Sequence, residues 1–210
     1  MIPYKLSYSN FVIASVICIV STTILFIMNG ILGTIPFFLL VNHDLGAAAD
    51  IVFTSITNFA EVIQWIIAAI IVLLFRRHFF PLLLVAFTIS TLLAQGIKNA
   101  LPEQARPSKA ITDASLYHSV KGMVLHTVNS FPSGHTTAAF TLFLTVCLFI
   151  HKKWIVPVGF TYALAVGYSR VYLAQHFPKD VAGGILVAVI SVCFAVVIQQ
   201  LIVYKFYKTK

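Results

Sequence analysis

The sequence predicts an all-α membrane protein, with six transmembrane helices packed in a compact bundle that forms a single domain over residues 1–210. Hydrophobic residues make up 60% of the chain and charged residues only 10%, which is far outside the composition of a soluble globular protein. A helix needs roughly 20 apolar residues to cross a bilayer. We expect such spans at about residues 10–33, 56–75, 79–98, 133–150, 154–172 and 181–204.

The first apolar stretch follows Lys5 and could be mistaken for a secretion signal. Its apolar run from Phe11 to Met28 is longer than the core of a signal peptide, which has roughly 7 to 15 residues. No small-residue cleavage site follows closely behind it. We therefore interpret this stretch as a retained membrane span.

Short turns predict how the following stretches pack. The second and third stretches are joined by residues 76–78, and the fourth and fifth by residues 151–153. Turns of this length predict antiparallel neighbouring helices in a bundle. The sixth stretch carries four small residues that predict close helix packing: Ala182, Gly183, Gly184 and Ala188.

The formal net charge of +8 is distributed unevenly across this six-span plan. One side holds eight basic residues and no acidic residue: Lys5, Arg76, Arg77, Lys152, Lys153, Lys205, Lys208 and Lys210. The other side holds six basic residues and all six carboxylates. The positive-inside rule places the first side, with both termini, in the cytoplasm. The basic charge therefore indicates topology and predicts no nucleic-acid partner.

The second of the outer loops, residues 99–132, contains apolar residues at helical spacing: Leu116, Val120, Met123, Val124 and Val128. This pattern predicts a short amphipathic helix, either at the membrane interface or packed on the bundle. The three cysteines, Cys18, Cys147 and Cys193, lie singly in different spans. They predict neither a disulfide nor a metal site.

The start of the fourth span predicts an anion site. Ser133-Gly134-His135 follows Pro132 there. The first backbone N–H groups of a helix have no intrahelical partner, and the helix dipole favours an anion beside them. A phosphate suits this position. Ser133 either caps the helix or donates its hydroxyl to a phosphate oxygen.

Charged residues at the ends of other spans are suited to the same chemistry. Arg170 ends the fifth span and Arg106 lies in the outer loop, and each is suited to bidentate phosphate binding or to snorkelling at the interface. Asp180 lies in the first turn of the sixth span, where the dipole favours a carboxylate. If the chain turns back after His176, Asp180 accepts from Nδ1–H and leaves Nε2 as a neutral nucleophile.

The other histidines are weaker candidates. His78 and His151 adjoin basic residues on the cytoplasmic side, and three histidines lie in the outer loops. A metal site formed by His43, Asp44, His118 and His126 remains an alternative, although no local ligand spacing supports it.

Three motifs between residues 98 and 180 resemble those of the type 2 phosphatidic acid phosphatase (PAP2) superfamily, which are integral-membrane lipid phosphatases with an active site related to that of vanadium haloperoxidases. The second and third motifs are matched in full by Pro132-Ser133-Gly134-His135 and by Ser169-Arg170 with His176 and Asp180. The first motif departs from the pattern. Seven residues separate Lys98 from Arg106-Pro107, where the family has six, and Lys109 is the rival lysine.

The resemblance implies roles for these residues. His176 would attack phosphorus with help from Asp180, while His135 would protonate the leaving oxygen and later activate water. Five residues would hold the phosphate oxygens: Lys98, Arg106, Ser133, Gly134 and Arg170. The resemblance implies neither a metal nor a cofactor. Fixed cations around a phosphoryl group and a two-step route through phosphohistidine are chemically consistent with these roles.

We therefore expect a metal-independent lipid phosphatase embedded in the bacterial cytoplasmic (inner) membrane, with its active site facing the periplasm. The expected substrates are undecaprenyl pyrophosphate, phosphatidylglycerol phosphate, phosphatidic acid and the lipid A 1-phosphate. A lipid phosphotransferase with the same site is an alternative. A small membrane transporter is another, but it would carry charges along the interiors of several spans. The sequence leaves the oligomeric state open.

Overall fold

The computed structural model describes residues 6–208, and it describes side chains as far as residue 201. Every regular element in that range is helical, which confirms the all-α prediction. The elements are α1 (Tyr8–Leu32), α2 (Thr34–Val41), α3 (Ala47–Asn58), the π-helical η1 (Phe59–Ile63), α4 (Gln64–Arg76), the 3₁₀ turn η2 (Arg77–Phe79), α5 (Phe80–Ala100), α6 (Pro107–Ala110), η3 (Ala114–Leu116), α7 (Gly134–Phe149), α8 (Ile155–Tyr172) and α9 (Pro178–Lys208). Lys5 and Lys210, two of the predicted cytoplasmic lysines, lie outside the described residues.

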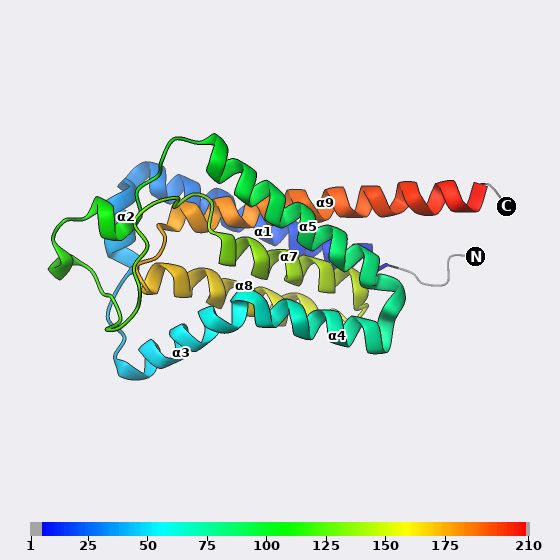
Figure 1. Cartoon of the computed structure of the whole chain (residues 1–210), viewed down its shortest axis with the longest axis horizontal. Coiled ribbons are helices and arrows are strands. Elements are labelled where there is room, and N and C mark those ends of the chain that lie inside the picture. Colours follow the sequence, from blue (N-terminus) through cyan, green and yellow to red (C-terminus); the bar gives the residue numbers. More distant parts are fainter. Residues whose placement is uncertain (1–5, 209–210) are drawn as a thin grey trace.

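Helix α7 is the centre of the bundle. It packs against α1, α5, α8 and α9, and Figure 1 shows the long helices running side by side along the long axis of the molecule. Residues on all sides of α7 are buried, including Ala139, Phe140 and Leu144. A helix that is apolar all round belongs in the interior. The outer loops, with α2 among them, lie at one end, and the turn from α4 to α5 lies at the other.

The outer surface of the bundle is apolar, as expected of a protein in contact with lipid. Helix α1 exposes Val16, Val20 and Ile24, for example, and a soluble monomer rarely exposes such large apolar areas. Three helical stretches among the described residues are long and apolar enough to cross a membrane: Tyr8–Leu32, Ala47–Ala100 and Pro178–Leu201. The second of these folds back on itself at η2. The count of six spans stays a prediction.

Residues 34–55, which lie between the first two predicted spans, are largely helical. Helix α2 lies within this range, and the helical run predicted to begin at about residue 56 begins at Ala47. The charged residue Asp50 interrupts the apolar pattern, which is why the predicted span began after it. In the structure the Asp50 carboxylate accepts a hydrogen bond from the Tyr172 hydroxyl at 2.6 Å and lies 3.0 Å from His118 Nε2, so the helix carries this charge with partners.

The prediction of an amphipathic helix over residues 116–128 was wrong. Only η3 is helical there, and the rest is irregular chain. The carbonyl oxygens of this segment accept hydrogen bonds from distant residues instead of from the next turn of a helix. Those of Thr127 and Val128 accept from Arg106, and that of Val124 accepts from the Gln175 side chain. Gly122 also has a positive φ of 86°.

The prediction of close packing at the start of α9 is confirmed. A Cβ atom added at Gly183 would lie 2.3 Å from the Phe131 ring, and one at Gly184 would lie 2.8 Å from the carbonyl oxygen of Ser133. Real side chains do not approach this closely, so only glycine permits this contact between α9 and the segment leading into α7. The backbone N–H of Ser133 donates to the carbonyl of Asp180 at 2.9 Å, which ties the two helix starts together.

Candidate active site

The chain turns back after α8 and places His176 beside Asp180. The backbone N–H groups of Gln175 and His176 both donate to the carbonyl of Arg170, at 2.9 and 3.0 Å, which closes the turn between α8 and α9. His176 Nδ1 then lies 3.6 Å from Asp180 Oδ2. This distance exceeds a hydrogen bond. Nδ1 of His176 and Oδ1 of Asp180 are buried without a hydrogen-bond partner among the described residues.

The environment of His176 keeps its imidazole neutral. Only 2% of the residue is exposed. Burial lowers the pKa of His176 well below its ordinary value of about 6.5, and the neighbouring Arg106 and Arg170 lower it further, whereas Asp180 acts in the opposite direction. A neutral imidazole with an available nitrogen is the form that a nucleophile requires.

The carboxylate of Asp180 is fixed from its other side. Oδ2 accepts hydrogen bonds from the hydroxyl of Ser130 and from the backbone N–H of Phe177. Ser130 is itself buried, and its backbone N–H donates to Gln104 at 3.2 Å. Two donors on one oxygen hold the carboxylate in one orientation toward His176.

Arg106 is held by main-chain carbonyls. Its backbone N–H donates to Thr127 at 2.9 Å, and its Nε donates to the carbonyl of Val128 at 2.8 Å. Nη1 donates to the carbonyl of Gln175 at 3.1 Å. The loop from 111 to 130 therefore wraps the guanidinium group and fixes its direction.

Arg170 is the second buried cation of the site. Its Nη1 donates to the hydroxyl of Thr57 on α3, and its Nε is buried without a partner among the described residues. Within those residues, neither Arg106 nor Arg170 forms an ion pair with a carboxylate. A buried cation without a counter-ion is costly, so this pair is arranged for an anion.

The N-terminus of α7 lies beside the start of α9 and so contributes to the same site. Ser133 caps the helix, because its Oγ accepts from the Thr136 N–H at 3.4 Å and from the Thr136 hydroxyl at 2.9 Å. Both bonds use Ser133 as the acceptor, and its own hydroxyl hydrogen has no acceptor in the described part of the chain. A Cβ at Gly134 would meet nothing within 4 Å, so there is open space in front of this helix N-terminus. His135 interacts electrostatically with Arg106, Arg170 and His176.

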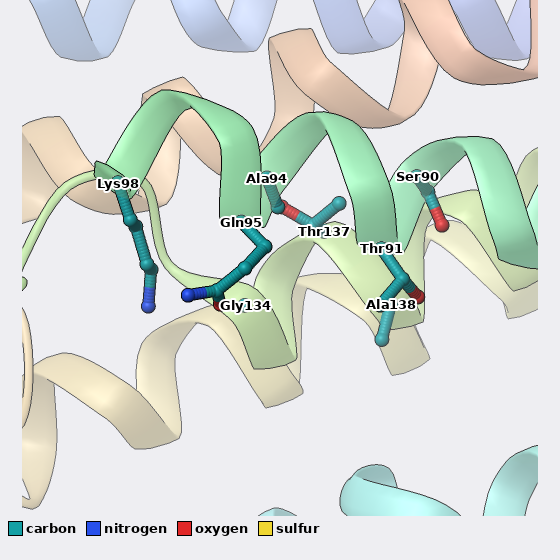
Figure 2. A pocket seen from close by; sticks show the side chains of 8 residues that line it. All are labelled: Ser90, Thr91, Ala94, Gln95, Lys98, Gly134, Thr137 and Ala138. Atoms are coloured by element: carbon teal, nitrogen blue, oxygen red, sulfur yellow. The ribbon is translucent and has the colours of Figure 1, made fainter. Parts of the chain in front are cut away.

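The two candidate lysines of the first motif lie in different surroundings. Lys98, in the last turn of α5, lines a groove of about 120 Å³ together with Gly134. Figure 2 shows Lys98 and Gln95 pointing from α5 toward the start of α7. Lys109 instead forms an ion pair with Glu103 at 2.6 Å, and its side chain is 49% exposed. The extra residue of the first motif therefore leaves Lys98 at the groove.

The outer loops also bring together a group of residues that could hold a metal ion. Ligand atoms of Asp44, Asp50 and His118 lie within 4.8 Å of one another. Of the four residues considered from the sequence, only Asp44 and His118 belong to this group, and Asp50 was not considered. His118 lies between the two carboxylates, with Nε2 at 3.0 Å from Asp50 and Nδ1 at 3.8 Å from Asp44.

Three residues that support the site were not identified from the sequence. Ser130 holds Asp180, Thr57 holds Arg170, and the carbonyl of Gln175 accepts from Arg106. Each acts across a tertiary contact, and no periodicity or spacing indicates such a contact.

The fold and the site together define a class of protein: a helical membrane bundle with a buried site lined by cations at one end. The chain belongs to the PAP2 superfamily, whose family model matches residues 80–204. It is 29% identical over 156 residues to an undecaprenyl-diphosphatase from Sulfolobus acidocaldarius, covering 71% of this chain and 70% of that protein. It is 36% identical over 74 residues to undecaprenyl-diphosphatase BcrC from Bacillus subtilis, covering 35% of this chain and 37% of that protein.

A solved structure supports the same family. The crystal structure of LpxE from Aquifex aeolicus superposes with a TM-score of 0.68 at 27% identity. The match covers 78% of this chain and 94% of that chain. The chain is therefore a membrane protein with the fold of this superfamily.

Proposed function

We propose that the protein is a lipid phosphatase that removes the terminal phosphate from a lipid diphosphate or lipid phosphate through a phosphohistidine intermediate. The observation that carries this proposal is the pair of buried arginines, Arg106 and Arg170, which form no ion pair with a carboxylate in the described residues and lie beside the neutral imidazole of His176. A tetrahedral dianion at that position would satisfy both guanidinium groups.

The reaction proceeds in two displacements. Nε2 of His176 attacks phosphorus, the bond to the leaving oxygen breaks, and His135 donates a proton to that oxygen. Asp180 stabilises the charged imidazole of the phosphohistidine. A water molecule then attacks phosphorus, His135 takes its proton, and inorganic phosphate leaves with His176 restored. Lys98, Arg106, Ser133, Gly134 and Arg170 hold the phosphoryl oxygens in both steps.

The substrate is a membrane lipid, and the names of the two relatives favour undecaprenyl diphosphate. Phosphatidylglycerol phosphate, phosphatidic acid and the lipid A 1-phosphate carry the same reacting group on other lipids. Helices that expose Val16, Val20 and Ile24 toward lipid keep the chain in the bilayer where these substrates reside.

The proposed active site faces the outside of the cytoplasmic membrane. The support for this orientation is the charge asymmetry. Arg76, Arg77, Lys152 and Lys153 lie at the opposite end of the helices from the motif residues, and no acidic residue accompanies them in those two turns.

Phosphate release from a panel of purified lipid phosphates in detergent tests the proposal. We expect hydrolysis to persist in excess EDTA and to be blocked by vanadate, because a trigonal-bipyramidal vanadate mimics the phosphorus attacked by His176. His176→Ala should abolish turnover. Activity that EDTA removes and Zn²⁺ or Mg²⁺ restores would contradict the mechanism, and transfer of phosphate to a second lipid would identify a phosphotransferase.

A further inference from the structure

The groove between α5 and α7 contains Lys98 and Gly134 of the proposed phosphate site and continues along the two helices, where Gln95 and Thr91 are exposed. Its lining residues are Ser90, Thr91, Ala94, Gln95, Lys98, Gly134, Thr137 and Ala138. An in-line displacement requires the leaving group to point away from the nucleophile. His176 comes from the turn between α8 and α9, and the groove is built from the other two helices, so it is suited to receive the leaving group.

The polar part of this lining is one helical turn long. Gln95 and Lys98 lie three residues apart on α5, which is about 4.5 Å along the helix. Figure 2 shows both side chains reaching toward Gly134. Gln95 Nε2 donates to Asn99 at 3.2 Å, so the amide keeps a second hydrogen and its carbonyl oxygen for other partners.

Beyond Gln95 the groove presents few hydrogen-bonding groups to a polar ligand. Ala94 and Ala138 contribute only methyl groups, and the hydroxyls of Ser90 and Thr137 donate to carbonyls of their own helices, at 2.9 Å each. Thr91 is exposed, and its hydroxyl is the remaining polar group of the lining. The lining therefore changes within about one turn from an ammonium and an amide group to small side chains, among which Thr91 alone keeps an unbonded hydroxyl in the described residues. A ligand that suits this order has one further anionic group next to the reacting phosphate and a hydrocarbon chain directly after it.

We propose that Gln95, together with Lys98, binds the second, non-transferred phosphate of a lipid diphosphate, and that Gln95 favours diphosphates over monophosphates. This inference rests on the proposed phosphatase function and names the substrate class of the same site. Lys98 lies between the two phosphates and serves both, whereas Gln95 contacts only the second. A lipid monophosphate places its first carbon atoms beside Gln95 and gains nothing from the amide.

The test compares farnesyl diphosphate with farnesyl monophosphate as substrates in detergent micelles. For Gln95→Leu we expect kcat/KM for the diphosphate to fall about 10- to 100-fold, as for a lost hydrogen bond to a charged group. The value for the monophosphate should stay within about twofold. Gln200→Leu is the matched control, because Gln200 is exposed on α9 and its Nε2 donates to the Tyr8 hydroxyl.

The outcomes separate the two proposals. A wild-type protein that releases phosphate from no lipid of the panel above, nor from either farnesyl substrate, contradicts the phosphatase function and the inference with it. A wild-type protein that hydrolyses lipids of that panel but not farnesyl diphosphate overturns the inference alone. A wild-type protein that is active, with a Gln95→Leu variant that loses both activities equally or neither, overturns the inference alone. If Gln95→Leu does not fold, Gln95→Asn is tested by inhibition of monophosphate hydrolysis. Pyrophosphate should then inhibit less strongly than with wild type while orthophosphate inhibits equally, and unchanged inhibition by pyrophosphate overturns the inference.

Discussion

At the scale of single residues, the orientation of Asp180 depends on Ser130, which lies outside the three motifs. For Ser130→Ala we expect kcat to fall about 10- to 150-fold with KM nearly unchanged, because a hydrogen bond to a charged group contributes about 1.5 to 3 kcal/mol and the Ser130 hydroxyl acts through Asp180. Steady-state kinetics measures both constants. Ser130→Cys, which keeps a weak donor of similar size, should recover part of the loss. An increase in KM alone would mean that Ser130 acts on binding.

The first motif allows a direct comparison of two lysines. Lys98→Ala should lower kcat/KM about 100- to 1000-fold, because it removes a cation at the developing phosphoryl charge. Lys109→Ala should change it by less than about threefold, because its ion pair with Glu103 is exposed. Measuring kcat/KM for both variants decides. A near-normal Lys98 variant beside an inactive Lys109 variant would assign the motif to Lys109.

The buried His176 predicts a pH dependence of stability. Because burial lowers its pKa, the folded protein resists a proton that the unfolded chain accepts below about pH 6.5. Stability from this source is complete above that pH and is lost progressively below it. We expect the fall in Tm between pH 7 and pH 5 to be smaller in His176→Asn than in wild type. Equal falls in the two proteins would mean that His176 takes up its proton in the folded state.

The motifs in the sequence indicated which residues would lie together, but they did not indicate which residues support them. The sequence placed His176 beside Asp180 only if the chain turns back between them, and the observed turn after Arg170 brings the two side chains to 3.6 Å. Thr57 could not be found in this way, because it is 113 residues from Arg170 in the chain. Contacts of this kind depend on how α3 packs on α8, which no local pattern encodes.

At the scale of elements, the contact between α7 and α9 depends on Gly184. Gly184→Ala would place a Cβ 2.8 Å from the Ser133 carbonyl and 2.9 Å from Thr136 Cβ, so α9 must shift. We expect a loss of about 1 to 3 kcal/mol of stability, as for overpacking, and a fall in kcat because the start of α7 moves with it. Tm and activity measure the two effects.

Gly30→Ala is the control for this substitution. Gly30 also lies inside a helix, but a Cβ there would meet nothing within 4 Å. Alanine at such a position should leave activity unchanged and stabilise the helix by about 0.5 to 1 kcal/mol. Equal effects of the two substitutions would show that the contact with Ser133 is not the cause.

The elements that hydrophobicity defines were predicted well, and those that tertiary hydrogen bonds define were not. The apolar runs of α1, α5 and α9 mark their helices within a few residues of the observed ends. Residues 116–128 have the same apolar spacing as a helix, yet their carbonyls bond to Arg106 and Gln175. The hydrophobic pattern of a single segment cannot predict the free energy of these long-range hydrogen bonds.

At the scale of the whole molecule, the proposed orientation predicts which surfaces face outward. In a background without Cys18, Cys147 and Cys193, a cysteine replacing Lys109 should react with an impermeant thiol reagent added outside intact cells. A cysteine replacing Lys152, at the other end of the bundle, should react only after the membrane is opened. Lys109, on α6, and Lys152, between α7 and α8, are both exposed, so the membrane decides whether the reagent reaches them. The opposite pattern of labelling would reverse the topology.

The hydrogen bonds that hold Arg106 determine which changes its loop tolerates. The acceptors for its guanidinium group are carbonyls of Val128, Asn129 and Gln175, and every amino acid carries a carbonyl. The exposed side chains of Ser119, Lys121 and Val124 can therefore be replaced, with glycine kept at 122, while the arginine keeps its position. Removing a single residue would displace the acceptors themselves, so the loop tolerates substitution and resists deletion.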